Sequence, residues 1–376
     1  PMVTAFKSAV AAFDRHLHEA FDPVHSNVNE LTALRSAFVD KILEKVWLQH
    51  FDADQKYAAL IAVGGYGRGE LFPGSDVDLM VLTGRLPTHG TLERVQQFLT
   101  FLWDIGLEVG HSVRTVRDAR IEAKADITVA TNIMEARLLL GSEDLFDAMR
   151  QTCGPAKIWP SRPFFLAKHE EQQQRYQRFD NTAYKLEPNL KESPGGLRDI
   201  QTIFWVAKRH FEVSSLQELV KHKYLTQDEY QALSEGLQYL GTLRMALHLL
   251  AGRREDRILF DHQRALAKQF GYQGEGNEPV EQFMQNFFRT VLELQRLNEM
   301  LLQHFQDDID LKPRWGRKQI QPINSRFQTR RGFIEVKNKK VFKAYPLALL
   351  EIFLILQQQP EIKGVTSSTI RLIRQY

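Results

Sequence analysis

The sequence predicts an α+β protein in which a small unit with strands precedes a larger, mostly helical region. Two short apolar runs, at 57–63 and 76–82, have the length and composition of buried strands, and a glycine-rich segment separates them. After residue 154, in contrast, apolar residues recur mainly at helical spacing. Strands and helices are therefore expected largely in different parts of the chain, as in the α+β class.

The composition is that of a folded protein without a strong bulk charge. The 376 residues are 43% hydrophobic and 25% charged, and 49 Lys and Arg against 46 Asp and Glu leave a net charge of +3. This balance argues against a protein that holds nucleic acid by bulk charge. The single cysteine, Cys153, excludes a disulfide framework and suits a reducing compartment. No apolar run approaches the roughly 20 residues of a membrane helix, so we expect a cytoplasmic protein with no membrane or nucleic-acid partner.

The first part of the chain is expected to hold N-terminal helices at 1–56 that pack on a unit at 57–153. Leu34, Phe38 and Ile42, for example, recur every four residues, which predicts a helix. The expected elements are, in order, helices at 4–21 and 27–50, strands at 57–63 and 76–82, a helix at 91–103, a strand at 107–115, and helices at 127–140 and 142–151.

The rest of the chain, 154–376, is expected to form a helical domain. Residues 154–163 contain three prolines and are the expected linker. Residues 324–336 depart from the helical pattern, because two alternating runs flank Arg330, Arg331 and Gly332, and this predicts a hairpin. The expected helices are at 164–179, 197–211, 228–250, 260–270, 280–305 and 346–357.

The glycine-rich segment begins with Gly64 and Gly65, directly after the first strand. Glycines let a backbone approach a phosphate closely and expose its N–H donors. The segment is not a P-loop, which requires Lys and then Ser or Thr after its last glycine, because Glu70 follows Gly69 here. A dinucleotide fingerprint would need glycine at position 70, so it is excluded as well.

Asp76 and Asp78 open the second strand two residues apart, so both side chains point to one face. Two such carboxylates repel each other unless a cation lies between them. Mg²⁺ binds one or two carboxylates together with substrate phosphates, so the pair predicts a nucleotide–metal site. The alternative is that Asp76 ends a turn and Asp78 is a solvated edge residue. The apolar run 79–82 argues against it, because it is typical of a strand buried on both faces.

These motifs resemble the nucleotidyltransferase (polymerase-beta-like) superfamily, and the segment 64–79 closely resembles the bacterial PII uridylyltransferase/uridylyl-removing family. Five further stretches are similar to blocks of that family: 107–115, 126–132, 187–201, 252–257 and 325–335. The resemblance covers roughly residues 27–376 and implies that 57–153 is a small mixed-sheet nucleotidyltransferase domain.

The resemblance also implies an activity. Members of the family transfer UMP from UTP to a tyrosine hydroxyl of the PII nitrogen-signalling protein and release pyrophosphate. It implies that Asp76 and Asp78 hold Mg²⁺ and act in catalysis, and that Gly64 and Gly65 cradle phosphates. Arg68 and Ser75, in the same segment, are expected to contact the nucleotide.

A second nucleotide contact is expected where Gly195 and Gly196 precede a helix. A glycine turn that leads into a helix N-terminus favours anions, and Lys191 and Arg198 would add positive charge. The alternative is a simple helix start in which Arg198 and Asp199 form a structural pair.

A third carboxylate is also expected in the site. Members of the superfamily usually add one on a later strand, where it can activate the nucleophile. Glu108 is our choice, because it lies on the strand at 107–115, with Asp104 and Asp126 as weaker candidates. Gly110 takes the place where related adenylyltransferases carry the acid, and Glu108 could equally be structural.

Three functions therefore stay open: a PII uridylyltransferase, a protein adenylyltransferase of the glutamine-synthetase-modifying type, and a non-catalytic module that binds PII or a nucleotide. Longer members of the family add a hydrolase (HD) domain with a His-Asp dyad and two glutamine-sensing ACT domains. No His-Asp dipeptide occurs in this sequence. We expect the transferase part without the HD and ACT domains.

Overall fold

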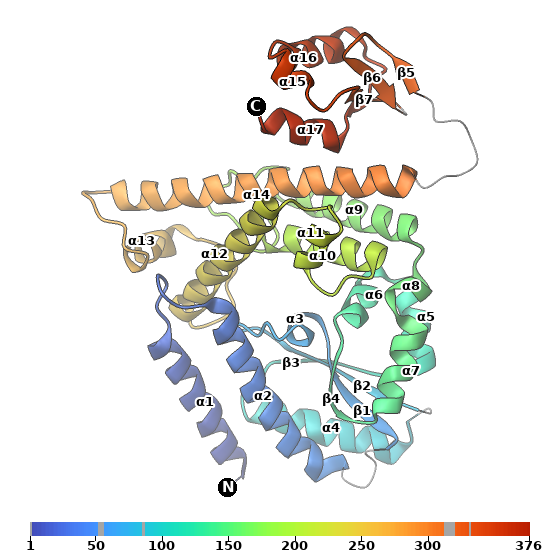
Figure 1. Ribbon diagram of the computed structural model, residues 1–376. Coiled ribbons are helices and arrows are strands. Elements are labelled where there is room, and N and C mark those ends of the chain that lie inside the picture. The colour runs from blue at the N-terminus through green and yellow to red at the C-terminus, as the bar shows by residue number, and fades with distance from the viewer. Residues whose placement is uncertain (1, 52–55, 85–86, 312–319, 331) are drawn as a thin grey trace.

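The computed structural model describes residues 2–51, 56–84, 87–311, 320–330 and 332–376. Two long helices, α1 (Met2–Ala20) and α2 (Val28–Phe51), come first. They lie beside a sheet unit, and a helical region and a small C-terminal unit follow (Figure 1). Within these described ranges, no helix is long and apolar enough to cross a membrane.

The sheet unit is built on four strands in the order β3-β2-β1-β4. Its strands are β1 (Ala58–Ala62), β2 (Val77–Thr83), β3 (Val109–Thr115) and β4 (Arg137–Gly141). β1 pairs antiparallel with β2 and β4, whereas β2 and β3 run parallel, so the sheet is mixed. This confirms the predicted α+β class.

Helices cover both faces of this sheet. Successive strand residues point to opposite sides, and the side chains on both sides are apolar and packed. Leu60 packs with Trp47 of α2 and with Phe98 of the helix α4 (His89–Asp104). Its neighbour Ile61 packs in a second cluster with Ala119 of the helix α5 (Val116–Ala125). The helices of this unit, besides α2, are α3 (Gly64–Gly67), α4 (His89–Asp104), α5 (Val116–Ala125), α6 (Ile127–Met134) and α7 (Glu143–Cys153).

One predicted helix is wrong in its second half. The helix expected at 127–140 ends at Met134, and Arg137–Gly141 forms strand β4 instead. The run Leu138–Leu140 is apolar and fits either structure locally. It becomes a strand because it pairs with β1, whose backbone groups on that side would otherwise lack partners.

The helical region packs around one large hydrophobic cluster. Its helices are α8 (Pro155–Ile158), α9 (Ser161–Arg178), α10 (Leu197–Phe211), α11 (Leu216–Lys221), α12 (Gln227–Ala251), α13 (Phe260–Gln269) and α14 (Glu278–Leu311). The segment expected as a linker, 154–163, is instead largely helical. Pro155 lies in the first turn of α8, where a missing N–H costs nothing, so this proline begins a helix rather than preventing one.

The C-terminal unit has its own four-stranded sheet and hydrophobic cluster. Its elements are β5 (Ile320–Pro322), β6 (Phe327–Arg330), β7 (Phe333–Val336), α15 (Val341–Ala344), α16 (Ala348–Gln358), β8 (Gly364–Val365) and α17 (Ser367–Arg374). β6 and β7 pair antiparallel at the predicted hairpin, while Arg331 lies outside the described residues. The unit rests on α14 through α17, where Ser367 hydrogen-bonds His304 and Asp307 (Figure 1).

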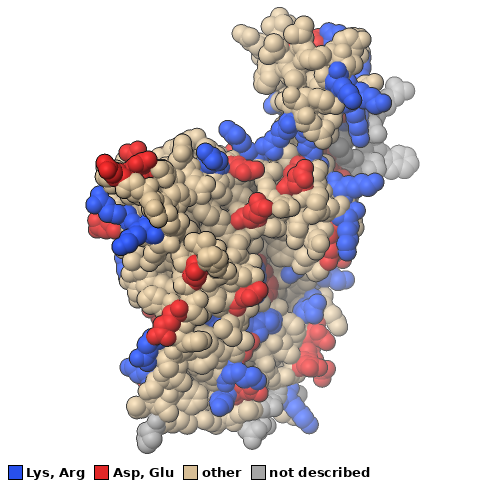
Figure 2. All heavy atoms as spheres, turned by 60° about the vertical axis from the view of Figure 1, so that its left-hand side comes forward, with Lys and Arg blue, Asp and Glu red and all other residues tan. Residues whose placement is uncertain are grey.

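Charged residues of both signs are interspersed over the face of the molecule in Figure 2. This distribution agrees with the small net charge.

Candidate functional site

A cavity lies where the sheet unit meets the helical region. Six of the residues that line it carry the argument that follows: Gly64, Gly65, Asp76, Asp78, Lys191 and Arg198. The first four belong to the sheet unit and the last two to the segment around the start of α10. The cavity therefore joins two parts of the chain that are distant in sequence, and it brings together both predicted nucleotide contacts.

The glycine-rich segment forms one helical turn, α3, rather than an open loop. Gly64 begins the turn with φ of +58°, a conformation that residues with a Cβ rarely adopt. Gly67 has a steric reason to be glycine, since a Cβ there would be 2.2 Å from the Glu135 carbonyl oxygen. The Tyr66 hydroxyl donates to Asp40 of α2 over 2.5 Å. This contact anchors the turn to α2.

The two acidic residues lie at the start of β2, with Asp76 just before the strand and Asp78 within it. The Asp78 carboxylate occupies a space that two glycines leave open. A Cβ on Gly110, the register partner of Asp78 on β3, would be 2.6 Å from Asp78 Oδ1. A Cβ on Gly64 would be 3.3 Å from Asp78 Oδ2. Burial, and then the charge of Asp76, raise the pKa of Asp78 above its ordinary value.

This donor set fits a divalent cation. Among the described residues, no hydrogen bond reaches the Asp78 carboxylate, and no third His, Cys, Asp or Glu joins the pair to form a cluster. Two carboxylates with an open side suit an ion that also binds substrate phosphates, as Mg²⁺ does. Asp76 and Asp78 would hold that ion.

The structure does not bring Glu108 into the cavity. Glu108 precedes β3 with an exposed side chain and lies near Asp76 in a separate, shallow depression that Trp103 also lines. The weaker candidates are also outside the cavity: Asp104 ends α4, and Asp126 caps α6 by accepting from the Thr128 N–H. The identity of the third carboxylate stays a prediction.

Arg68 and Ser75 both line the cavity, as expected of nucleotide contacts. The Arg68 guanidinium, however, is already paired inside the protein. Its Nε lies 2.9 Å from Glu70 and its Nη1 lies 2.6 Å from Glu135. The Trp205 indole also donates to Glu135, over 2.6 Å. Arg68 therefore ties α3 to α10 as well as facing the cavity.

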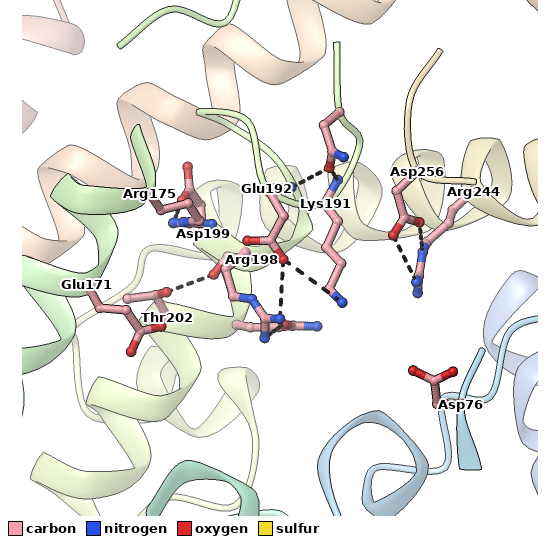
Figure 3. A network of polar contacts seen from close by, with 12 residues as sticks. Asp76, Glu171, Arg175, Lys191, Glu192, Arg198, Asp199, Thr202, Arg244 and Asp256 are labelled. Atoms are coloured by element: carbon pink, nitrogen blue, oxygen red, sulfur yellow. Dashed lines mark hydrogen bonds and ion pairs between the residues drawn. The ribbon is translucent and has the colours of Figure 1, made fainter. Parts of the chain in front are cut away.

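Lys191 and Arg198 extend toward the cavity with little neutralising charge (Figure 3). The Lys191 ammonium is 4.0 Å from its nearest paired carboxylate, Glu192. Burial, reinforced by the charges of Arg198 and Arg244, lowers the pKa of Lys191 to about 8. Arg198 lies 3.4 Å from Glu192 and donates to Gln201 over 2.8 Å. Two partly buried, weakly paired cations favour an anionic ligand.

Asp199 does not pair with Arg198, so the simple structural pair is not found. The Asp199 carboxylate points away from the cavity and is fully buried. It accepts from Arg175 over 2.5 Å, from Tyr176 over 2.5 Å and from the Gly195 N–H over 2.7 Å. These bonds fix the glycine turn before α10. The fixed turn places Arg198 at the cavity (Figure 3).

Two further arginines line the cavity that the sequence did not single out as site residues: Arg244 and Arg254. Arg244, on α12, binds Asp256 over 2.6 Å. Arg254, in the turn after α12, lies 2.9 Å from Asp76. The charged block at 252–257 was the only signal for this contact, and it also fits an ordinary solvated turn.

Comparison with protein families gives three matches. Residues 42–135 match the nucleotidyltransferase domain, 163–302 match the GlnD PII-uridylyltransferase, and 327–376 match the third domain of uridylyltransferase GlnD. The first two ranges supply the two walls of the cavity. Enzymes with a nucleotidyltransferase domain generally use a divalent metal.

Curated relatives extend the similarity to nearly the whole chain. A protein of Pseudomonas aeruginosa PAO1 is 49% identical over 374 residues, one of Ectopseudomonas mendocina 46% identical over 376, and one of Pseudomonas putida GB-1 45% identical over 376. Each is named a bifunctional uridylyltransferase/uridylyl-removing enzyme. The matches cover 99–100% of this chain and 41% of each relative. These relatives match nearly the whole chain, and the two GlnD models match the helical wall of the cavity and the C-terminal unit. The chain therefore belongs to the GlnD uridylyltransferase family.

Proposed function

We propose that this chain transfers UMP from UTP to a tyrosine hydroxyl of the PII signalling protein and releases pyrophosphate. One observation carries the proposal. The carboxylate pair Asp76 and Asp78 faces the weakly neutralised cations Lys191 and Arg198 across one cavity. An acidic pair for a metal opposite cations for phosphates is what nucleotidyl transfer requires.

In the proposed reaction, the tyrosine oxygen attacks the α-phosphorus of UTP. A bond from that oxygen to phosphorus forms, the bond from the α-phosphorus to the bridging oxygen breaks, and pyrophosphate leaves with the electron pair. Bound Mg²⁺ would neutralise phosphate charge in the transition state. Lys191 and Arg198 would bind the phosphates, and the bare backbone at Gly64 and Gly65 would allow them to approach closely.

The tyrosine proton needs an acceptor, and we propose Glu108 for this role. Its side chain is exposed and lines a shallow depression together with Asp76. A base acts only if it reaches the proton in the complex. The Glu108→Gln variant should therefore lose transfer without losing affinity for UTP.

The test is transfer of label from each α-³²P nucleoside triphosphate to purified PII protein in the presence of Mg²⁺. Label should pass from UTP to PII and not to PII in which the target tyrosine is phenylalanine. The Asp78→Asn variant is the control for the site. Preferential transfer from ATP would favour a protein adenylyltransferase. UTP binding without any transfer would favour a non-catalytic module.

A further inference from the structure

The Arg254 guanidinium is hydrogen-bonded to Asp76, one of the two carboxylates that would hold a metal ion. Arg254 belongs to the turn between α12 and α13, and its Nη1 lies 2.9 Å from Asp76 Oδ2. Its only other ion-pair partner among the described residues is Asp256, at 4.0 Å. The side chains of Arg254 and Asp76 are 48% and 42% exposed, so neither is locked in place by packing.

The backbone of this turn, in contrast, is held firmly against the sheet unit. A Cβ on Gly74 would be 2.6 Å from the Arg254 backbone nitrogen, so the two segments are in close contact. The His248 imidazole contacts both the Pro73 carbonyl and Asp256. The main chain at Arg254 is therefore fixed beside the cavity, and only its long side chain is free to change partner.

A divalent cation and the Arg254 guanidinium compete for Asp76, because both are positive and both use the same carboxylate. When a cation binds there, the guanidinium loses its main partner but stays tethered at the cavity, which it lines together with Lys191 and Arg198. The phosphates of a bound nucleotide are the anions that then come within its reach. Guanidinium groups match phosphate oxygens well in charge and geometry.

We propose that Arg254 is an exchangeable cation: it neutralises Asp76 while the site is empty and binds the polyphosphate of the nucleotide once a metal ion takes Asp76. The proposal rests on the proposed function only in that the cavity receives a nucleoside triphosphate. It assigns to Arg254 a role in coupling metal binding to nucleotide binding.

The proposal predicts opposite effects on two ligands when Arg254 is replaced by glutamine. Metal binding alone should tighten, by about 2- to 5-fold, because an exposed ion pair no longer competes for Asp76. Polyphosphate binding in the presence of metal should weaken, by about 10-fold or more, because a charge-assisted hydrogen bond is lost. A merely structural role for Arg254 would weaken both.

The experiment measures Mn²⁺ binding to the 376-residue chain by electron paramagnetic resonance, and inorganic tripolyphosphate binding in excess Mg²⁺ by calorimetry. Arg253→Gln is the matched control, because Arg253 lies in the same turn, is 67% exposed and pairs with Glu255 rather than Asp76. It should change neither affinity. Arg254→Lys keeps the charge but not the planar fork, so its metal affinity should stay near wild type while polyphosphate binding weakens partly.

Weaker Mn²⁺ binding by Arg254→Gln, or unchanged tripolyphosphate binding, would overturn the proposal, as would equal effects in Arg253→Gln. Neither probe contains uracil or PII. Opposite shifts in a chain that fails to transfer UMP would therefore leave this inference intact. A chain that transfers UMP without these shifts would refute the inference alone.

Discussion

At neutral pH, the ionised Asp78 carboxylate lowers the stability of the fold. Burial and the charge of Asp76 raise its pKa, while Lys191 and Arg254 offset this only in part. The folded state therefore binds a proton at Asp78 more tightly than the unfolded chain. Its contribution to stability is present at acidic pH and is lost as the pH rises through the raised pKa of the folded state. At neutral pH the ionised carboxylate is a cost, which is typical of a functional group.

The first prediction follows at this residue. Asp78→Asn should reduce nucleotidyl transfer by at least about 100-fold, because metal charge stabilisation contributes several kcal/mol. The melting temperature at neutral pH should stay equal or rise, since a partly buried charge is removed. Transfer assays and thermal denaturation measure the two effects. Asp147→Asn, which changes an exposed carboxylate on α7 that does not line the cavity, is the control and should keep full activity. Normal turnover in Asp78→Asn would refute the metal site.

The second prediction concerns Lys191, whose pKa is lowered to about 8. A lysine with its ordinary pKa stays charged to about pH 10, whereas Lys191 in the empty site loses its charge above about pH 8. Tripolyphosphate affinity should therefore fall between about pH 8 and 10. Lys191→Arg keeps its charge throughout this range, so its affinity should change less with pH. Parallel pH profiles for the two proteins would contradict this assignment.

At the scale of elements, α3 and the start of β2 depend on glycines with different tasks. Gly64 and Gly69 both have positive φ, of +58° and +75°. A Cβ on Gly64 would contact Asp78 Oδ2 at 3.3 Å, whereas a Cβ on Gly69 would meet nothing within 4 Å. The two positions therefore share a backbone strain but differ in what a side chain would touch. Substitutions at the two glycines can therefore distinguish an effect on stability from an effect on the site.

The third prediction uses this pair. Gly64→Ala and Gly69→Ala should each lower the free energy of unfolding by about 1–2 kcal/mol, because both place a Cβ in the left-handed region. Only Gly64→Ala should also weaken binding of Mn²⁺ and of UTP, since it crowds Asp78. Denaturant titration and calorimetry provide the two readouts. Equal ligand affinities in the two variants would show that the space beside Gly64 is not part of the site.

At the scale of the whole molecule, the cavity depends on the fit between the sheet unit and the helical region. The segment around Gly74 makes one close contact between them, because its missing side chain lets it lie directly on the backbone of Arg253 and Arg254. Asp256 supports this contact through His248, whose imidazole contacts both Asp256 and the Pro73 carbonyl. Burial opposes its ionisation, but the His248 hydrogen bond and the Arg244 charge outweigh this and hold the pKa of Asp256 below its ordinary value.

The fourth prediction tests this fit. Gly74→Ala should lower both the melting temperature and the affinity for tripolyphosphate, because a Cβ would be 2.6 Å from the Arg254 nitrogen and would push the two walls of the cavity apart. Gly252→Ala is the matched control. Its φ of +63° is similar, but a Cβ there would meet nothing within 4 Å. If the two variants lose equal stability and equal affinity, the contact does not hold the cavity together.

The sequence by itself determined the local chemistry of this protein. The strand at β2 follows from an apolar run, the convergence of Asp76 and Asp78 from the period of a strand, and the helix α10 from its apolar spacing after two glycines. These features depend on residues close together in the chain, so a periodic pattern is enough to predict them.

Only the tertiary structure decided which distant segments and side chains pair with one another. β4 is a strand because its backbone pairs with that of β1. The Asp199 side chain points into the protein because Arg175 and Tyr176 donate hydrogen bonds to its carboxylate there. Arg254 reaches Asp76 from a position 178 residues later in the chain. No local pattern encodes such pairings, because burial, backbone satisfaction and charge compensation are settled between distant segments only when the chain is folded.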